Sequence, residues 1–331
     1  MFYKSIARPL LFSLDPSFVH KSCLTTGEWL GNSTVMCGAF ERLYGYHNSD
    51  LVRTVDGLTY HTPFVLAAGF DYNARLVRVL PSFGFGGIEV GSVTARLWGG
   101  NAKPQLLRDV ARESIIVNKG LKNEGVAVIA ERIMSAPRRE GFVVGVSVAR
   151  TNDGKSDSLE DGIADYRYTL NYCTERSVGD YYTINISCPN THTGELFTDP
   201  HYFDLLMSEL DTIAHSCPVY IKMPISIPDE QFYALAECAA QHRVNGLIIG
   251  NLYKENGRAY SGAPCRTRST ELICLTCSRF GSRFTLIGCG GVSTAEHARE
   301  KFDAGASLIQ LITGLVYEGP SIVNNCAQGA R

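Results

Sequence analysis

The run Tyr182–Asn190 carries the side chains best placed to do chemistry. Its apolar, β-branched first half predicts a buried strand, and a Pro-Asn-Thr turn follows. The strand would present Asn185, Cys188 and Asn190 at its carboxyl end, where parallel α/β folds place their ligands. A thiol there can act as a base or nucleophile, and two amides can orient a small polar substrate. A cysteine that only fills core space is the alternative.

The elements that must position these residues repeat along the chain. A hairpin signal, two short alternating runs around Asp56-Gly57, precedes eight apolar runs separated mostly by amphipathic stretches such as Asp229–Gln241 and Thr294–Ala304. This alternation predicts an α/β fold, a (β/α)8 TIM barrel whose N-terminal floor is closed by the hairpin. The eight predicted strands are Phe64–Ala68, Gly87–Gly91, Phe142–Val148, Tyr182–Ser187, Val219–Met223, Gly246–Gly250, Thr285–Gly288 and Ser307–Ile312.

The carboxyl ends of these strands supply the candidate cofactor residues. Glycine-rich turns follow the seventh and eighth strands, at Gly290-Gly291 and Thr313-Gly314, and such turns bind phosphate through backbone N–H groups and helix dipoles. Lys222 ends the fifth strand between apolar neighbours, which favours a cation near the barrel axis over a surface lysine. A phosphate cradle, a cation and a thiol together indicate a phosphorylated cofactor, and flavin mononucleotide (FMN) would use all three.

Composition and charge are those of an ordinary enzyme. The chain has 331 residues, of which 45% are hydrophobic and 19% are charged, and its formal net charge is -2. This length can bury a large core. The sequence shows no basic stripe, so nucleic acid is not an expected partner. Eleven cysteines without a framework of spacings favour reduced thiols. The one CxxC, Cys274 and Cys277, is interpreted as two thiols on a helix, and no metal site is predicted.

The N-terminus predicts a separate helical segment. Residues 1–14 combine Lys4 and Arg8 with apolar side chains, but Pro9 interrupts a run that is already too short to cross a bilayer. We expect an amphipathic surface segment, the alternative being a helix that packs on its own domain. A second helix is predicted to start at Asp15-Pro16. The domain hypothesis is thus a helical segment over residues 1–48 and the barrel over 49–331.

The chain resembles the dihydroorotate dehydrogenase family over nearly its full length, and in particular its quinone-linked, membrane-associated class. Seven segments carry the resemblance in the family's order. They are MFYKSIARPLLFSLDPSFVHK, LAAGFDYNARLVRVLPSFGFGGIEVGSVTAR, GNAKPQLLR, NEGVAVIAERI, INISCPNT, YSGAP and GCGGVSTAEHAREKFDAGASLIQLITGLVYEGP.

This resemblance implies an FMN enzyme of pyrimidine biosynthesis. Hydride would pass between N5 of the flavin and a substrate carbon, while a side chain exchanges a proton at the adjacent carbon. Cys188 matches that acid–base residue, and Asn185, Asn190 and Asn251 match substrate contacts. The positions that match flavin contacts are Ala68, Gly69, Ser92, Asn185, Lys222, Gly262, Gly291 and Thr313, to which the turns above add Gly290 and Gly314.

Several residues depart from the family's pattern. Quinone-linked members usually have serine at the base, whereas Cys188 resembles the soluble class. Tyr72 stands where the family has a lysine that contacts flavin and substrate carboxylate, and Val117 stands where it has a substrate-binding asparagine. Asn118 or Lys122 could substitute for that asparagine. Ser147 replaces a flavin-facing asparagine. We therefore count Tyr72 and Asn118 as substrate-binding candidates and Ser147 as a flavin-binding candidate.

These departures leave alternatives for the function. The first is an FMN oxidoreductase, either a divergent dihydroorotate dehydrogenase or a paralogue for a different C=C substrate. The second is a flavin-binding barrel that no longer turns over. Orotate is expected to bind weakly unless Lys119 or Lys122 folds inward. The resemblance further implies a quinone acceptor, and with residues 1–14 it indicates a cytoplasmic protein held peripherally on the inner membrane.

Overall fold

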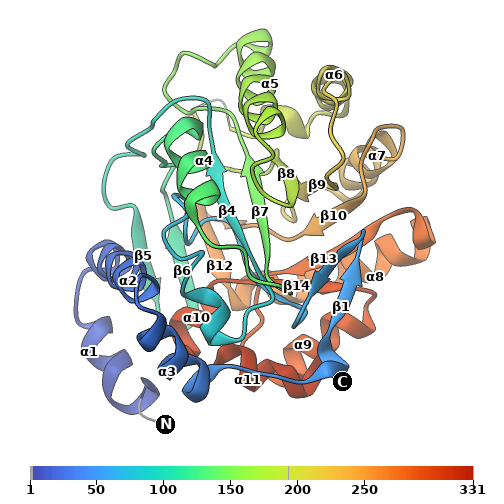
Figure 1. Ribbon diagram of the computed structural model, residues 1–331. Helices are drawn as coiled ribbons and strands as arrows, with labels where there is room; N and C mark the ends of the chain where they lie inside the picture. Colours follow the sequence, from blue (N-terminus) through green and yellow to red (C-terminus); the bar gives the residue numbers. More distant parts are fainter. Residues whose placement is uncertain (1–2, 193, 331) are drawn as a thin grey trace.

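Eight parallel strands close into a barrel in the computed structural model, which describes residues 3–192 and 194–330 (Figure 1). Met1 and Phe2 of the predicted amphipathic segment lie outside these residues. The TIM-barrel prediction is confirmed, and each predicted strand contains or overlaps an observed one. Around the barrel the strands are β3 (Phe64–Leu66), β4 (Gly87–Val93), β7 (Val143–Val148), β8 (Tyr181–Asn185), β9 (Val219–Met223), β10 (Gly246–Ile249), β13 (Thr285–Cys289) and β14 (Leu308–Leu311).

Helices surround the barrel and cover its apolar strands (Figure 1). They form where apolar residues recur every three or four positions. In α7, Phe232, Leu235, Ala236 and Ala239 are buried on one face. The helices predicted at 229–241 and 294–304 correspond to α7 and α9. The bounds are α4 (Val126–Ser135), α5 (Leu159–Glu175), α6 (Pro200–Leu210), α7 (Asp229–Ala239), α8 (Arg266–Phe280), α9 (Ala295–Asp303), α10 (Thr313–Glu318) and α11 (Ile322–Ala327).

The predicted hairpin is present and closes the amino-terminal end of the barrel. Strands β1 (Arg53–Val55) and β2 (Leu58–Tyr60) pair around Asp56 and Gly57, both of which have positive φ. Tyr60 is fully buried in a cluster with barrel residues such as Tyr181 and Tyr220. The Tyr220 hydroxyl donates to Asp56 Oδ2 at 2.7 Å, which fixes the turn under the barrel. The hairpin does not cover the opposite end of the barrel, where the strands have their carboxyl ends, so that end can hold a ligand.

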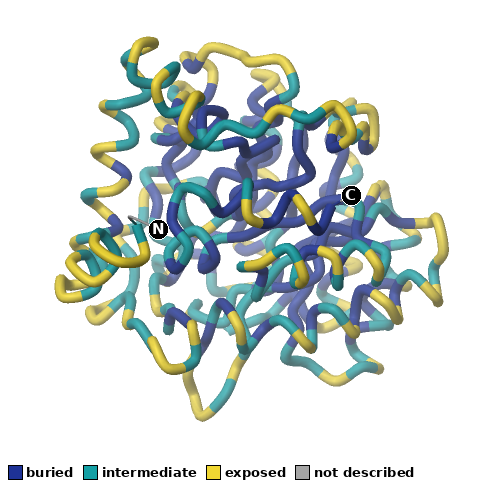
Figure 2. The backbone as a smooth tube through the Cα atoms, turned by 90° about the horizontal axis from the view of Figure 1, so that it is seen from below, coloured by how far each residue is buried: buried dark blue, intermediate teal, exposed yellow. Residues whose placement is uncertain are grey.

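The chain before the hairpin is helical. A π-helical turn (Tyr3–Ala7) leads into α1 (Arg8–Phe12), α2 (Pro16–Gly31) and α3 (Thr34–Tyr44), which lie at one side of the barrel (Figure 1). The predicted start of α2 is confirmed, because Asp15 accepts a hydrogen bond from the Phe18 N–H at 2.8 Å. Exposed residues lie mainly on the outer elements, around a buried barrel core (Figure 2). Within the described ranges, no helix is both long and apolar enough to cross a membrane.

A four-stranded antiparallel sheet is the main element that sequence analysis did not predict. It joins β5 (Leu106–Asp109) and β6 (Ser114–Val117) to β11 (Tyr253–Glu255) and β12 (Arg258–Gly262) in the order β11-β12-β6-β5. The sheet exists because β6 pairs with β12, with Ile116 opposite Tyr260. Strands this short carry little periodic signal of their own, so only their distant partner defines them.

Candidate active site

A cavity of about 590 Å³ opens at the carboxyl end of the barrel. It lies between the barrel strands, the antiparallel sheet and the helices α1 and α2, each of which contributes lining residues. A volume of this size is typical of small-molecule and cofactor sites. The predicted site residues that line it are Ala68, Gly69, Tyr72, Ser92, Asn185, Cys188, Asn190, Lys222, Asn251, Gly262, Gly290, Gly291, Thr313 and Gly314.

Two candidates are not among the lining residues. Ser147 is fully buried within β7, where its hydroxyl lies 3.0 Å from the Ser92 hydroxyl. Asn118 is exposed, and its Oδ1 accepts from Asn101 Nδ2 at 2.9 Å. Its neighbours Val117 and Lys119 line the cavity instead. The alternation of side chains along this stretch turns Asn118 away from the cavity, so it is not in position to contact a ligand there.

Hydrogen bonds fix the amide of Asn185 at the end of β8. Its Nδ2 donates to Ser92 Oγ at 2.7 Å, and its Oδ1 accepts from both the backbone N–H and the hydroxyl of Ser187 at 3.2 Å. The Tyr166 hydroxyl donates to the Asn185 carbonyl at 2.6 Å. The side chain is therefore held at the cavity wall before any ligand binds, which lowers the cost of ordering it.

The loop that carries Cys188 is held by amides on both sides. Asn190 Nδ2 donates to the Val117 carbonyl at 2.9 Å, and Asn251 Nδ2 donates to the Ser187 carbonyl and hydroxyl, both at 2.8 Å. Both NH2 groups are thus turned toward protein. The side-chain oxygens of Asn190 and Asn251 accept no protein hydrogen bond among the described residues, so they are available to a ligand.

The thiol of Cys188 has a higher pKa than an unperturbed cysteine. Burial raises its pKa to about 11, although the Asn190 backbone N–H favours the thiolate. The unperturbed pKa near 8.5 would have allowed proton exchange close to neutrality. With this pKa the half-buried thiol is protonated at neutral pH, so proton removal from a substrate depends on the small thiolate fraction.

The glycine turns form one end of the cavity. Gly290 and Gly291 have φ of 105° and 75°, in the left-handed region that favours glycine. A Cβ at Gly314 would lie 2.2 Å from the Val292 carbonyl oxygen, so only glycine fits beside that turn. Thr313 begins α10, and the N–H groups of this first helical turn have no partner within the helix. The turns therefore offer backbone donors to an anion.

Lys222 lies in a buried polar network across the barrel. Its Nζ donates to Gln310 Oε1 at 2.6 Å and lies 3.7 Å from Glu89 Oε1. Glu89 Oε2 accepts from Gln310 Nε2 at 2.7 Å, from the Thr183 hydroxyl at 2.8 Å and from the Tyr181 hydroxyl at 3.3 Å. Lys222 and Glu89 are both buried, so removing either side chain would leave the charge of the other uncompensated in the protein interior.

We expect Glu89→Gln to lower the free energy of unfolding by about 3–5 kcal/mol, because it leaves the Lys222 ammonium buried without an anion. Chemical denaturation followed by fluorescence measures this loss. Glu140→Gln, in an exposed loop, is the control and should change stability by less than about 0.5 kcal/mol. A Glu89→Gln protein as stable as wild type would show that the charge on Lys222 does not need the carboxylate.

The family profile for dihydroorotate dehydrogenase matches residues 50–330, which is most of the chain. The chain belongs to the dihydroorotate dehydrogenase family. The dihydroorotate dehydrogenase (quinone) of Haloarcula marismortui is 35% identical over 339 residues, covering 98% of this chain and 93% of that protein. The enzyme of the same name from Ralstonia nicotianae is 33% identical over 345 residues, covering 98% and 97%. This membership makes the chain an oxidoreductase, a dehydrogenase acting on CH–CH groups.

Solved structures agree with the fold of this dihydroorotate dehydrogenase family member. The Eimeria tenella dihydroorotate dehydrogenase in complex with ferulenol superposes with a TM-score of 0.80 at 23% identity, covering 94% of this chain and 89% of that one. The ligand-free form of the same protein gives the same TM-score and covers 94% and 93%. At this identity the likeness establishes the barrel and its surrounding elements.

Sequence reasoning did not foresee how Lys119 and His20 meet in the cavity of this family member. Lys119 Nζ lies 3.1 Å from His20 Nδ1 and 3.2 Å from the Tyr72 hydroxyl. His20 comes from α2, and Tyr72 from the loop after β3. The sequence signal was limited to a lysine two positions after Val117, because nothing local shows which way a loop side chain points.

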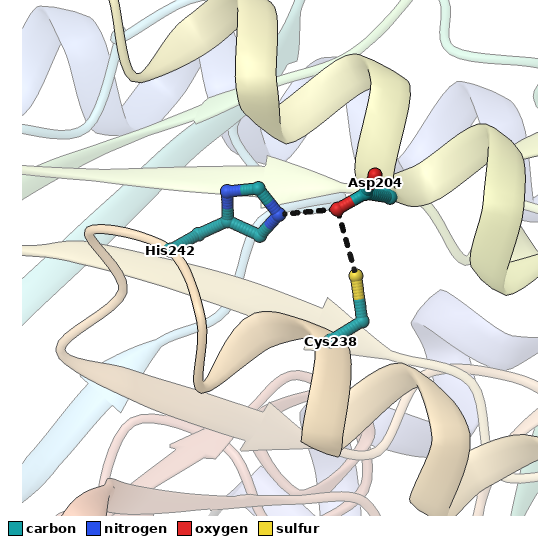
Figure 3. Close-up of side chains that lie close together, drawn as sticks. All are labelled: Asp204, Cys238 and His242. Carbon is teal, nitrogen blue, oxygen red and sulfur yellow. Dashed lines mark hydrogen bonds and ion pairs between the residues drawn. The ribbon is translucent and has the colours of Figure 1, made fainter.

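A second cluster of polar side chains lies on the outer helices (Figure 3). His242 Nε2 is 3.0 Å from Asp204 Oδ1, and Cys238 Sγ is 3.7 Å from the same oxygen. The other ring nitrogen of His242 is 2.9 Å from Asp211 Oδ2. None of these residues lines the cavity. The cluster joins α6 to α7 and the turn after it, so it stabilises the outer layer of the barrel.

Proposed function

We propose that the protein is an FMN-dependent oxidoreductase that moves hydride between the flavin and a CH–CH group of a small substrate, dihydroorotate or a related compound. One observation carries the proposal: a single cavity is lined by Cys188, the three asparagines, Lys222 and the two glycine turns. These are the groups that a phosphorylated redox cofactor and a polar substrate require together.

The residues present fit FMN. Gly290, Gly291 and Gly314 would hold the phosphate through backbone N–H groups, in turns where a side chain would collide with protein. Lys222 would hold the electron-rich edge of the ring, because its charge is buried and already oriented by Gln310. When bound, the flavin supplies the hydride acceptor that side chains lack.

The chain's own part in the reaction is proton transfer and substrate orientation. Cys188 would exchange a proton at the substrate carbon next to the one that exchanges hydride. The side-chain oxygens of Asn190 and Asn251 accept hydrogen bonds, so they favour a substrate that presents N–H groups, such as a dihydropyrimidine. Asn185 would contact both flavin and substrate from the wall between them.

The purified protein is expected to be yellow and to contain FMN without a covalent link. Heat denaturation should release the chromophore, and mass spectrometry should identify it as FMN. The glycine turns provide donors for one phosphate and no covalent attachment is required. Recovery of FAD, or a colourless protein that does not take up added FMN, would contradict the cofactor assignment and favour a barrel without turnover.

A quinone is the proposed electron acceptor, and a membrane surface is its proposed source. Apolar side chains of α1 and α2 line the cavity, including Leu11, Phe12, Val19 and Leu30. Large apolar side chains in and beside these helices are exposed, namely Ile6, Leu10, Leu14, Phe18 and Trp29, and Leu14 and Phe18 also line the cavity. Such a surface suits peripheral contact with lipid. It would place the protein on the cytoplasmic side of the inner membrane.

Tyr72 and Val117 favour a second candidate, a paralogue for a different C=C substrate. Both residues line the cavity, and each is a departure from the family's pattern at a substrate-contacting position. Anaerobic titration separates the candidates: dihydroorotate should bleach the flavin if it is the substrate, whereas a panel of other dihydropyrimidines and enoates should contain the active compound if it is not.

A further inference from the structure

The charges that line the cavity are all of one sign. Among the described residues, its wall includes basic side chains and no aspartate or glutamate. A cavity of this kind favours an anionic occupant. The phosphate of a bound flavin would meet the glycine turns after β13 and β14. The basic residues are His20, Arg108, Lys119, Lys122 and Lys222.

Two of these cations are already engaged. Lys222 faces Glu89 and Gln310 within the barrel. Arg108 donates to the carbonyl oxygens of Phe12 at 3.2 Å and Leu14 at 2.7 Å, and its guanidinium lies 4.6 Å from the centre of the Phe12 ring. These contacts hold Arg108 against α1. Lys119 and Lys122 are left as the cations that could meet a second anion.

Lys119 has a fixed position and no carboxylate partner among the described residues. His20 Nε2 lies 2.7 Å from the Phe70 carbonyl, which can only accept, so Nε2 carries the ring proton and Nδ1 accepts from Lys119. Burial lowers the pKa of His20 to about 3 and raises the pKa of Tyr72 to about 12, so both partners are neutral near pH 7. Two of the three ammonium donors are used, which leaves one donor for a ligand, and neither partner offsets the charge of the ammonium.

The segment that carries Lys119 is attached to the loop of the reactive thiol. Asn101 N–H donates to the Lys119 carbonyl at 3.1 Å, and Asn101 Nδ2 donates to the Asn190 carbonyl at 2.9 Å. Asn190 in turn holds the Val117 carbonyl. The cation therefore belongs to the wall shared with Cys188, whereas the phosphate turns follow different strands.

We infer that Lys119 binds the carboxylate of the substrate, with Tyr72 and His20 holding its ammonium in place. The inference rests on the proposed function, since that function assigns this part of the cavity to substrate. Lys119 is thus a specificity-determining residue that selects anionic substrates over neutral ones of the same shape. Lys122 makes no hydrogen bond or ion pair among the described residues, so nothing orients it for the same task.

The charge of Lys119 should respond to pH. Burial, with the charge of Lys122, lowers the pKa of Lys119 to about 7. The free protein therefore loses this charge as pH rises through 7, and carboxylate binding must restore the proton. Affinity for an anion should fall about 10-fold from pH 6 to pH 8. The groups facing Lys119 are His20, Tyr72 and Lys122, and those acting on Tyr72 are Asp71, Arg75 and Glu124.

Calorimetric titration of the protein as purified tests this with two probes, orotate and its uncharged amide. At pH 6 the wild type should prefer orotate by roughly 10- to 100-fold, the usual effect of one charged hydrogen-bond partner. Lys119→Met should abolish the preference, and Lys122→Met should retain it. Lys119→Arg should retain it and remove the pH dependence between pH 6 and 8, because arginine stays charged.

Three results would overturn the inference. They are equal binding of both probes by wild type, an undiminished preference in Lys119→Met, and loss of the preference in Lys122→Met alone. If Lys119→Met does not fold, an unchanged pH profile in Lys119→Arg would overturn it as well. The flavin content of the same sample tests the proposed function separately, because a colourless protein with a Lys119-dependent preference would refute the cofactor and keep the anion site.

Discussion

Cys188→Ala is expected to slow substrate-driven reduction of the flavin by roughly 10²-fold or more, the usual size of an acid–base contribution. The flavin spectrum should be unchanged, because the side chain is proposed to contact substrate and the loop is held by Ser187 and Asn190. Anaerobic stopped-flow absorbance at the flavin maximum measures the rate. Cys188→Ser should fall between alanine and wild type, since a hydroxyl can still exchange a proton but is a weaker acid than a thiol.

The pH profile separates a base from a packing residue. Burial raises the pKa of Cys188 to about 11, and the thiolate is the form that accepts the proton. The wild-type rate should therefore rise with pH up to that region, by about 10-fold per unit. Cys188→Ala should lose this slope. Cys274→Ala, at an exposed thiol on α8, is the control and should match wild type. A Cys188→Ala enzyme near the wild-type rate would return Cys188 to a structural role.

Deleting residues 1–14 is expected to abolish quinone reduction while flavin reduction by the substrate remains measurable. The deletion removes Leu11 and Phe12 from the cavity wall. Burial of each such side chain contributes about 1.5–3 kcal/mol, so losing both should weaken binding of a lipophilic acceptor by at least roughly 10²-fold. The deletion retains the Asp15 cap and the helices α2 and α3, so the rest of the N-terminal helical segment should keep its fold.

Two half-reactions measured on one preparation make the result specific. Flavin reduction by substrate is followed without quinone, and reoxidation is followed after adding a soluble ubiquinone analogue. Val35→Ser is the matched control, because Val35 is an exposed apolar residue of α3 that does not line the cavity. If the truncated enzyme reoxidised as fast as wild type, the segment would serve packing or membrane contact alone.

Local patterns were sufficient for the barrel and for most of the cavity wall. A buried parallel strand is a short apolar run, and eight such runs separated mostly by amphipathic stretches leave few other folds. Once the strands are parallel, their carboxyl ends meet at one face. Asn185, Lys222 and the two glycine turns therefore share a cavity although the chain separates them widely.

The remaining features depend on contacts between distant segments. The four-stranded antiparallel sheet forms only because β6 pairs with β12, and neither strand is long enough to show an alternation of apolar and polar residues. Ser147 and Asn118 have the expected chemistry, but Ser147 is buried in β7 against Ser92 and Asn118 bonds to Asn101, so neither is a lining residue of the cavity. The pKa of Cys188 depends on burial, which local sequence does not contain.

The surroundings of Tyr72 show most clearly which features the sequence determines and which depend on the tertiary structure. The sequence alone determined that a tyrosine replaces the lysine of the family's pattern, and it predicted weak binding of a carboxylate unless another lysine turned inward. Both Lys119 and Lys122 line the cavity, and the tertiary structure decided that Lys119 is the one held by hydrogen-bond partners. Lys119 reaches Tyr72 because α2, the loop after β3 and the loop after β6 converge there, and His20 supplies the neutral acceptor. A charge inside a cavity is placed by packing of distant segments, so no pattern along one segment could have located it.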